Sequence, residues 1–148
     1  MRQAQYAEAE QAFLTALAQS GDRRKSMMGL GMARMGLDNA GQAWNDFCAL
    51  LNEFPDDVEA IHWLLRAGSA RGSWTELSER LQGFVSRNPA DLSVRYALAG
   101  ALIRSGQPDA AQQEYRTLCA LAPSYEGLEE LAQALSNHET LAETVPQS

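Results

Sequence analysis

The chain has 148 residues, of which 45% are hydrophobic and 21% are charged, a balance typical of a folded domain with a sizeable core. Its formal net charge of -7 argues against a sequence-independent grip on nucleic acid phosphates. The polar N-terminus holds no hydrophobic signal region, and no apolar run approaches the length of a membrane span. We therefore expect a cytoplasmic protein that contacts neither nucleic acid nor membrane.

Residues 1–21 predict a single amphipathic helix. Its apolar positions Tyr6, Ala9, Phe13, Ala16 and Leu17 fall at helical spacing. A helix with one apolar stripe needs a neighbour, and this segment lacks the preceding helix that would complete a hairpin. We expect either a longer array or a second chain to cover it. Tyr6, Phe13 and Leu17 are therefore candidates for self-association into a homodimer.

Residues 22–55 predict a helical hairpin, with a first helix from about Asp22 and a second from Ala40 to Glu53. The glycines of the first helix do not predict a phosphate loop, because no strand precedes them and no Gly-Lys-Ser/Thr follows. Its methionines Met28, Met32 and Met35 share one stripe. They form either an adaptable apolar binding site or a packing surface for a neighbouring helix.

The three consecutive basic residues at 23–25 open this first helix, and we interpret them as a solvated edge rather than a binding arm. The next hairpin covers residues 56–89, and Asp56 with Glu59 predicts a capping-box-like start. Its second helix opens at Trp74 and ends before Pro89.

A third hairpin covers residues 90–123, with Asp91 as the expected N-cap of its first helix and Pro108 at the start of its second. After Pro123, Ser124 is expected to cap a final helix over residues 124–137, whose stripe is Leu128, Leu131 and Leu135. This helix would shield the end of the array, and residues 138–148 would form a flexible tail.

The hairpins repeat with a fixed period, because Pro55, Pro89 and Pro123 lie 34 residues apart. The first full unit reads Met27-x2-Leu30-Gly31-x2-Arg34, then Ala43-x3-Phe47, then Pro55, and the unit ending at Pro123 keeps Leu98, Ala111 and Tyr115 at the same places. This pattern resembles the tetratricopeptide repeat. The resemblance implies an all-α, right-handed α-solenoid of antiparallel helix pairs, with three full repeats between the N-terminal half repeat and the capping helix.

The resemblance also implies a concave groove lined by the first helices of the repeats, where a protein or peptide segment would bind. Carried over by position, the groove candidates are Met28, Met32, Met35, His62, Trp63, Arg66, Tyr96 and Arg104. Trp63 has the alternative role of filling the core between repeats. The lysine and asparagine clamp that some family members use for acidic C-terminal peptides is not reproduced, so we do not expect chaperone tails to bind.

Side chains that would support catalysis are scarce. His62 and His138 are the only histidines and lie far apart in the repeat array, while Cys48 and Cys119 fall on different repeats and are expected to be reduced thiols. We predict no catalytic, cofactor or metal site. The sequence favours a non-catalytic interaction scaffold, with a homo-oligomerisation module, or an accessory segment of a longer bacterial glycosyl- or methyltransferase, as the alternatives.

Overall fold

The computed structural model describes residues 2–19 and 21–144, and the side chains of these residues through Asn137. Within these ranges the chain forms eight α-helices and no strand, as predicted for an all-α fold. The chain divides into two compact units, with the boundary between Ser73 and Trp74. No helix in the described ranges has both the length and the apolar character needed to cross a membrane.

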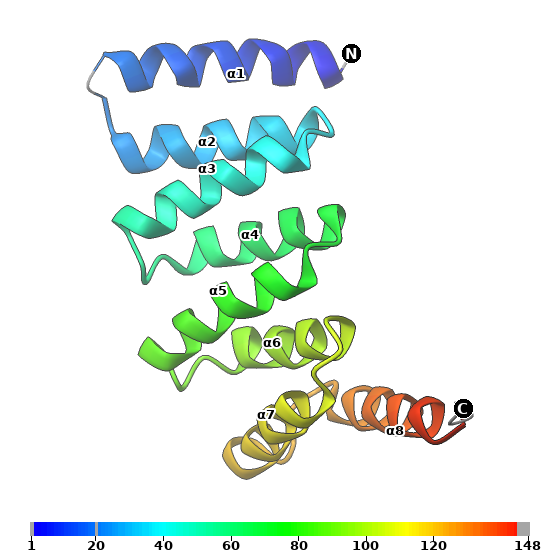
Figure 1. Ribbon diagram of the computed structural model, residues 1–148. Coiled ribbons are helices and arrows are strands. Elements are labelled where there is room, and N and C mark those ends of the chain that lie inside the picture. The colour runs from blue at the N-terminus through cyan, green and yellow to red at the C-terminus, as the bar shows by residue number, and fades with distance from the viewer. Residues whose placement is uncertain (1, 20, 145–148) are drawn as a thin grey trace. The chain divides into compact units, whose positions relative to one another are not determined.

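The first unit consists of four helices that follow one another as antiparallel neighbours (Figure 1). They are α1 (Arg2–Ala18), α2 (Arg23–Gly36), α3 (Ala40–Glu53) and α4 (Val58–Arg71). Each packs against the next, and α4 also touches α2 across the hairpin. The helical hairpins therefore form as the 34-residue period predicts. The largest fully buried side chains of this unit are Phe47, Leu50, Ile61 and Leu64.

The second unit contains α5 (Trp74–Arg87), α6 (Leu92–Arg104), α7 (Pro108–Leu121) and α8 (Leu128–Thr144). Helix α6 lies at its centre and packs against the other three. Its largest fully buried apolar side chains are Leu77, Leu81, Phe84, Leu98 and Leu118, and buried valines and alanines complete the core. Leu77 is fully buried, although the tetratricopeptide pattern has alanine at this position, as Ala43 and Ala111 show in the other two repeats.

An aspartate caps the N-terminus of the first helix in each full repeat. Asp22, Asp57 and Asp91 accept hydrogen bonds from the backbone N–H groups of the residues three positions later, at 3.1, 3.0 and 3.0 Å. The prediction for Asp91 is confirmed. Asp56 was the wrong candidate, because Asp57 is the residue whose backbone is extended and whose carboxylate caps α4.

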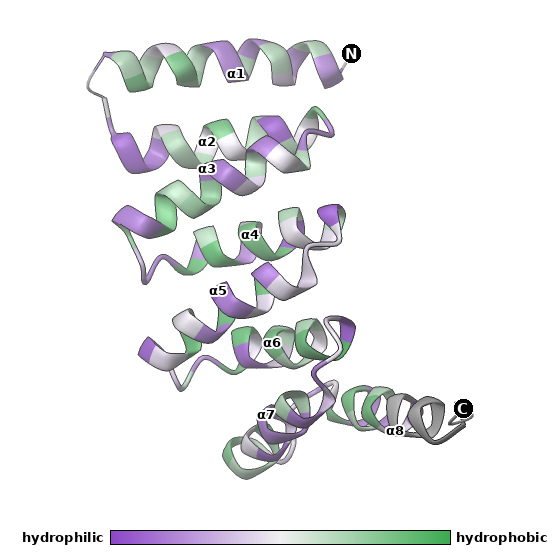
Figure 2. Ribbon diagram, viewed as in Figure 1, coloured by the Kyte–Doolittle hydropathy of each residue, from purple (hydrophilic) through white to green (hydrophobic). Residues whose placement is uncertain are grey.

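Arginines at the start of α2 join this helix to the end of α3 and to the start of α4. Arg24 pairs with Asp57, and its Nη2 also lies 3.3 Å from Glu59 Oε2. Arg23 Nη2 lies 2.7 Å from Glu53 Oε1. Figure 2 shows that the first turn of α2 is hydrophilic. Two of the residues in this turn, Arg23 and Arg24, form ion pairs.

The C-terminal helix differs from the prediction at both ends. It begins at Leu128 rather than after Ser124, because the chain turns first and Gly127 adopts a φ of 102°, which a helix does not accommodate. It continues to Thr144, past the expected end at residue 137, because His138–Thr144 contains no glycine or proline. Leu131 and Leu135 are buried as expected. The last residues of the expected tail, 145–148, lie outside the described residues.

Replacing Asp57 with asparagine should lower the free energy of unfolding by about 1 kcal/mol. Asparagine caps a helix as well as aspartate does, so the loss isolates the pair with Arg24. Burial alone would raise the pKa of Asp57, but the Arg24 hydrogen bond, the backbone hydrogen bonds and the Arg24 charge together lower it. The stabilisation is therefore present above the ordinary carboxyl pKa of about 3.9 and is lost as the pH falls through the folded pKa.

The matched control is Asp91→Asn, at a cap that has the same backbone hydrogen bond and no arginine pair in the described residues. Urea unfolding at pH 7 should show a cost for Asp57→Asn and almost none for Asp91→Asn. Equal costs for both variants would contradict the proposed contribution of Arg24.

Candidate functional site

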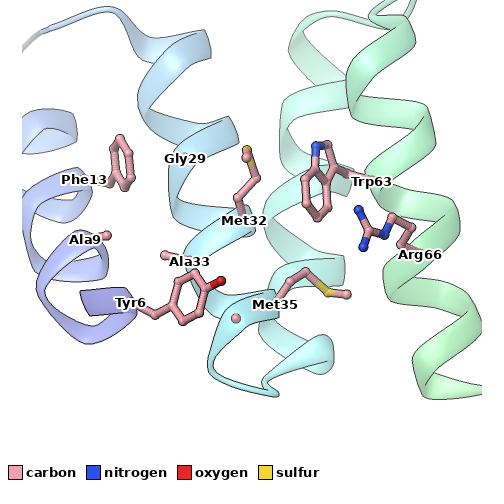
Figure 3. A pocket seen from close by; sticks show the side chains of 10 residues that line it. Tyr6, Ala9, Phe13, Gly29, Met32, Ala33, Met35, Trp63 and Arg66 are labelled. Atoms are coloured by element: carbon pink, nitrogen blue, oxygen red, sulfur yellow. The ribbon is translucent and has the colours of Figure 1, made fainter. Parts of the chain in front are cut away.

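A pocket of about 420 Å³ lies in the first unit, between α1, α2 and α4. Helix α1 contributes Tyr6, Ala9 and Phe13 to its lining, and α4 contributes Trp63 and Arg66. Helix α2 forms the wall between them with Gly29, Met32, Ala33, Met35 and Gly36. Figure 3 shows the aromatic rings and thioethers of the three helices around the same space. The polar side-chain groups of the lining are the Tyr6 hydroxyl, the Trp63 indole N–H and the Arg66 guanidinium, and the other lining side chains are apolar.

Two glycines of α2 allow α1 to approach closely and so fix one wall of the pocket. A Cβ atom on Gly29 would lie 2.2 Å from Cζ of Phe13, and one on Gly36 would lie 2.5 Å from the ring of Tyr6. Both distances are too short for any side chain, so the two rings rest directly on the backbone of α2. The aromatic residues and the glycines are each seven positions apart, which keeps both contacts on one face of each helix.

A third glycine of α2 receives a ring from the other side. A Cβ on Gly31 would lie 2.5 Å from Cε1 of Phe47, which is fully buried on α3. The ring of Phe47 in turn stacks on Trp63, with the centroids 5.9 Å apart and the planes at 18°. The indole that forms the α4 wall is therefore supported from the core.

Arg66 extends from α4 over the exposed side of Trp63. Its Cζ lies 4.5 Å from the centroid of the indole, within the range of a cation–π contact. Within the described ranges Arg66 has no carboxylate partner, whereas Arg23, Arg24, Arg34 and Arg95 all do. Figure 3 shows the guanidinium beside the indole at the edge of the pocket. Among the described residues no carboxylate occupies its N–H groups, which leaves them available to a ligand.

The same arginine–tryptophan stacking occurs at the other two tryptophans. Arg71 lies over Trp44 in the first unit, at 5.4 Å, and Arg104 lies over Trp74 in the second unit, at 4.7 Å. Neither of these pairs lines the pocket. Arg104 is therefore a suitable control for Arg66, because it has the same stacked geometry at another place.

The α1 wall is also tied to α2 and α3 by charge. Arg34 Nε lies 3.0 Å from Glu10 Oε2, and its Nη1 lies 2.7 Å from Asp46 Oδ1. All three side chains are largely buried, and Asp46 Oδ2 has no hydrogen-bond partner among the described residues. Burial raises the pKa of Asp46, and the hydrogen bond and charge of Arg34 only partly oppose this.

Of the groove residues predicted from the sequence, the structure brings Met32, Met35, Trp63 and Arg66 together around the pocket. Met28 does not line it, because its side chain is buried with only 5% exposed. His62 is half-buried on α4 and is not part of the lining either.

The other two groove candidates belong to the second unit and have partners there. Tyr96 packs against Tyr125, with the ring centroids 5.7 Å apart, and its hydroxyl lies against Gly127. Arg104 stacks on Trp74. Both side chains therefore contribute to packing within their own unit.

The residues predicted for self-association lie on the side of α1 that meets α2. Tyr6 and Phe13 rest on the glycines of α2, and Leu17 lines a small pocket together with Met27 and Leu30. Helix α2 covers part of this stripe, because all three side chains are half-buried and no residue of α1 is fully buried. Sequence reasoning missed Tyr6 and Phe13 as pocket residues. The signal was present, because the seven-residue spacing of these two aromatics matches that of Gly29 and Gly36.

The described side chains contain no group of three histidine, cysteine, aspartate or glutamate residues that could hold a metal ion. The two cysteines are free, Cys48 buried and Cys119 half-buried. The chemistry that the pocket offers is therefore apolar contact, aromatic stacking and one cation.

Comparison with known proteins gives a family and a fold. The family model described as bacterial transcriptional activator domain matches residues 31–129. No curated protein matches the sequence. A tetratricopeptide repeat protein from Parabacteroides merdae superposes with a TM-score of 0.79 at 11% identity, covering 93% of this chain and 55% of that one. The chain thus spans about half the length of that protein.

A second similar structure is a fragment of MamA from Desulfovibrio magneticus. It superposes with a TM-score of 0.63 at 18% identity, and the match covers 96% of this chain and 90% of that one. At these identities the likeness shows the tetratricopeptide-like fold alone.

Proposed function

Because this chain belongs to the bacterial transcriptional activator domain family, we propose that it is a non-catalytic protein-interaction domain of a bacterial transcriptional regulator. The observation that supports this most is the pocket between α1, α2 and α4, which combines aromatic rings, flexible thioethers and one uncommitted guanidinium. These are the side chains that anchor protein interfaces. A partner segment would insert an apolar side chain into the pocket and place an acidic group on Arg66.

We further propose that the domain acts through a protein partner rather than by holding DNA. The chain carries a net charge of -7, and its basic cluster at the start of α2 is engaged, with Arg23 paired to Glu53 and Arg24 paired to Asp57. Releasing these arginines to bind phosphates would break contacts between helices. Affinity for a phosphate backbone depends on several free cations, and the start of α2 offers few.

Two alternatives were drawn from the sequence. The family match favours transcriptional control as the context over sugar or methyl transfer. Self-association through α1 stays the second alternative, because Tyr6, Phe13 and Leu17 are only half-buried and α1 contacts no described helix other than α2.

Affinity capture with the purified chain tests the proposal. Arg66→Glu reverses the charge at the pocket and leaves the core intact, since the Arg66 side chain is exposed. A partner bound by the wild-type chain should be retained at least about tenfold less by this variant, which corresponds to about 1.4 kcal/mol. Quantitative mass spectrometry of proteins captured from the source organism would measure this ratio.

Arg104→Glu is the matched control, because it removes the same kind of stacked arginine away from the pocket. A partner retained by wild type and Arg104→Glu but lost from Arg66→Glu would support the pocket as the binding site. Equal retention by all three chains, or no retained protein, would count against it. In cells, Arg66→Glu should alter the transcripts that the regulator controls, and Arg104→Glu should not.

A further inference from the structure

The pocket is larger than a site for one anchoring side chain. Its volume of about 420 Å³ lies within the range of roughly 300–1,000 Å³ found for small-molecule sites. Such sites are mostly apolar and contain a few placed polar groups that orient the ligand. The lining here has this composition, because aromatic rings and thioethers make up most of it and Arg66 is its one charged side chain.

The walls of the pocket are held in place from outside it. Phe13 and Tyr6 are seated on Gly29 and Gly36, where a Cβ atom would lie 2.2 Å and 2.5 Å from their rings. On the opposite wall, Trp63 is stacked on the ring of Phe47, which is fully buried. A preformed cavity of this kind lowers the entropic cost of binding, since the lining need not be ordered by the ligand.

The positive charge of Arg66 favours a ligand that carries a negative charge. Arg66 is the only charged residue in the lining, and it has no carboxylate partner in the described part of the chain. A guanidinium stacked on an indole keeps its N–H edge free for a bidentate pair with a carboxylate. An anionic group beside an apolar body therefore complements this pocket.

We propose that the pocket binds a small amphipathic monocarboxylic acid, with an aliphatic or aromatic body between α1, α2 and α4 and its carboxylate on Arg66. Binding of the acid by the chain is independent of any protein partner. The regulatory consequence rests on the proposed function, since an acid in the pocket excludes the apolar side chain of a partner segment and so couples partner binding to the concentration of the acid.

Isothermal titration calorimetry with three ten-carbon probes tests the chemistry. Decanoate, decan-1-ol and decylammonium share one apolar body and differ in charge, and each is titrated below the concentration at which it forms micelles. We expect saturable binding of decanoate at one site, binding of decan-1-ol that is at least about tenfold weaker, and weaker binding still of decylammonium. Absence of saturable decanoate binding, or equal binding of the three probes, would overturn the proposal.

Two arginine variants locate the carboxylate. Arg66→Met keeps the length and apolar character of the side chain and removes its charge, so decanoate should bind about as weakly as decan-1-ol while decan-1-ol is unaffected. Arg104→Met removes the stacked arginine of the second unit and should bind decanoate like the wild-type chain. Unchanged affinity in Arg66→Met, or an equal loss in both variants, would show that the acid does not sit on Arg66.

The outcomes of this test and of the partner capture are separable. The titration uses the chain alone, so a negative result rejects the acid and leaves the capture result standing. If both tests succeed, added decanoate should release the captured partner from the wild-type chain and should not affect a partner still bound by Arg66→Met.

Discussion

Replacing Phe47 with alanine is expected to lower the free energy of unfolding by about 3–5 kcal/mol, the range found for removal of a buried aromatic side chain. Phe47 is fully buried, its ring fills the space over Gly31, and it supports Trp63 from below. Phe47→Leu keeps most of the apolar volume and should cost about 1–1.5 kcal/mol. Urea unfolding followed by circular dichroism would measure both values.

The contact between Gly31 and the Phe47 ring allows a second test of the same packing. In the wild-type chain, Gly31→Ala should cost about 1–3 kcal/mol, because the new Cβ would lie 2.5 Å from the Phe47 ring, which has nowhere to move. In the Phe47→Ala background the same substitution should stabilise the chain by up to about 1 kcal/mol, since alanine favours a helix over glycine. Such a change of sign is measured directly by a double-mutant cycle.

Gly41→Ala provides the control within the same unit, because a Cβ at Gly41 meets no atom within 4 Å. It should be neutral or slightly stabilising in both backgrounds. If Gly31→Ala were as harmless as Gly41→Ala in the wild-type chain, the close approach of α2 and α3 would be contradicted.

Replacing Arg34 with methionine is expected to cost about 3 kcal/mol or more at pH 7. Arg34 is 17% exposed and neutralises two carboxylates, Glu10 on α1 and Asp46 on α3, which its loss would leave uncompensated in a largely buried site. Arg23→Met is the matched control. Its partner Glu53 and Arg23 itself are exposed, so its loss should cost much less than the loss of Arg34.

The stability penalty of Arg34→Met should become smaller as the pH falls. Burial already raises the pKa of Asp46 in the wild-type chain, and removing Arg34 raises it further. A carboxyl whose folded pKa exceeds its unfolded value favours folding when protonated, so stability is recovered as the pH falls through the folded pKa. Unfolding at pH 7 and pH 5 should therefore show a smaller penalty for Arg34→Met at pH 5. A penalty that is constant or larger at pH 5 would contradict this.

Periodicity in the sequence was sufficient to predict that the chain forms helical hairpins, although the final helix begins and ends later than predicted. The 34-residue spacing of Pro55, Pro89 and Pro123 marks where hairpins end, and Asp91 and Trp74 mark where helices begin. These features are local, because capping and proline geometry depend on a few neighbouring residues. The local sequence did not show which of Asp56 and Asp57 caps α4, because aspartate is a good N-cap at either position. Asp57 also pairs with Arg24, which lies on another helix, and local sequence cannot show such a contact.

The candidate site was predicted only in part, for a related reason. The helical period fixes which face of α2 holds Met28, Met32 and Met35, but it does not specify how far along that face the neighbouring helices reach. Met28 is consequently buried, while Met32 and Met35 line the pocket. Likewise, the apolar stripe on α1 predicts that Tyr6 and Phe13 contact a neighbour, but it does not show that Gly29 and Gly36 of α2 are where their rings rest.

Helix α1 is attached to the rest of the first unit along one side only. Among the described helices it contacts α2 alone, and none of its residues is fully buried. Its amides should therefore exchange with solvent faster than those of α3, because local opening of α1 costs less than unfolding of the unit. Since α1 forms one wall of the pocket, each opening of α1 would also expose the apolar side chains that line the opposite wall. Loss of the Glu10–Arg34 ion pair should make such openings more frequent.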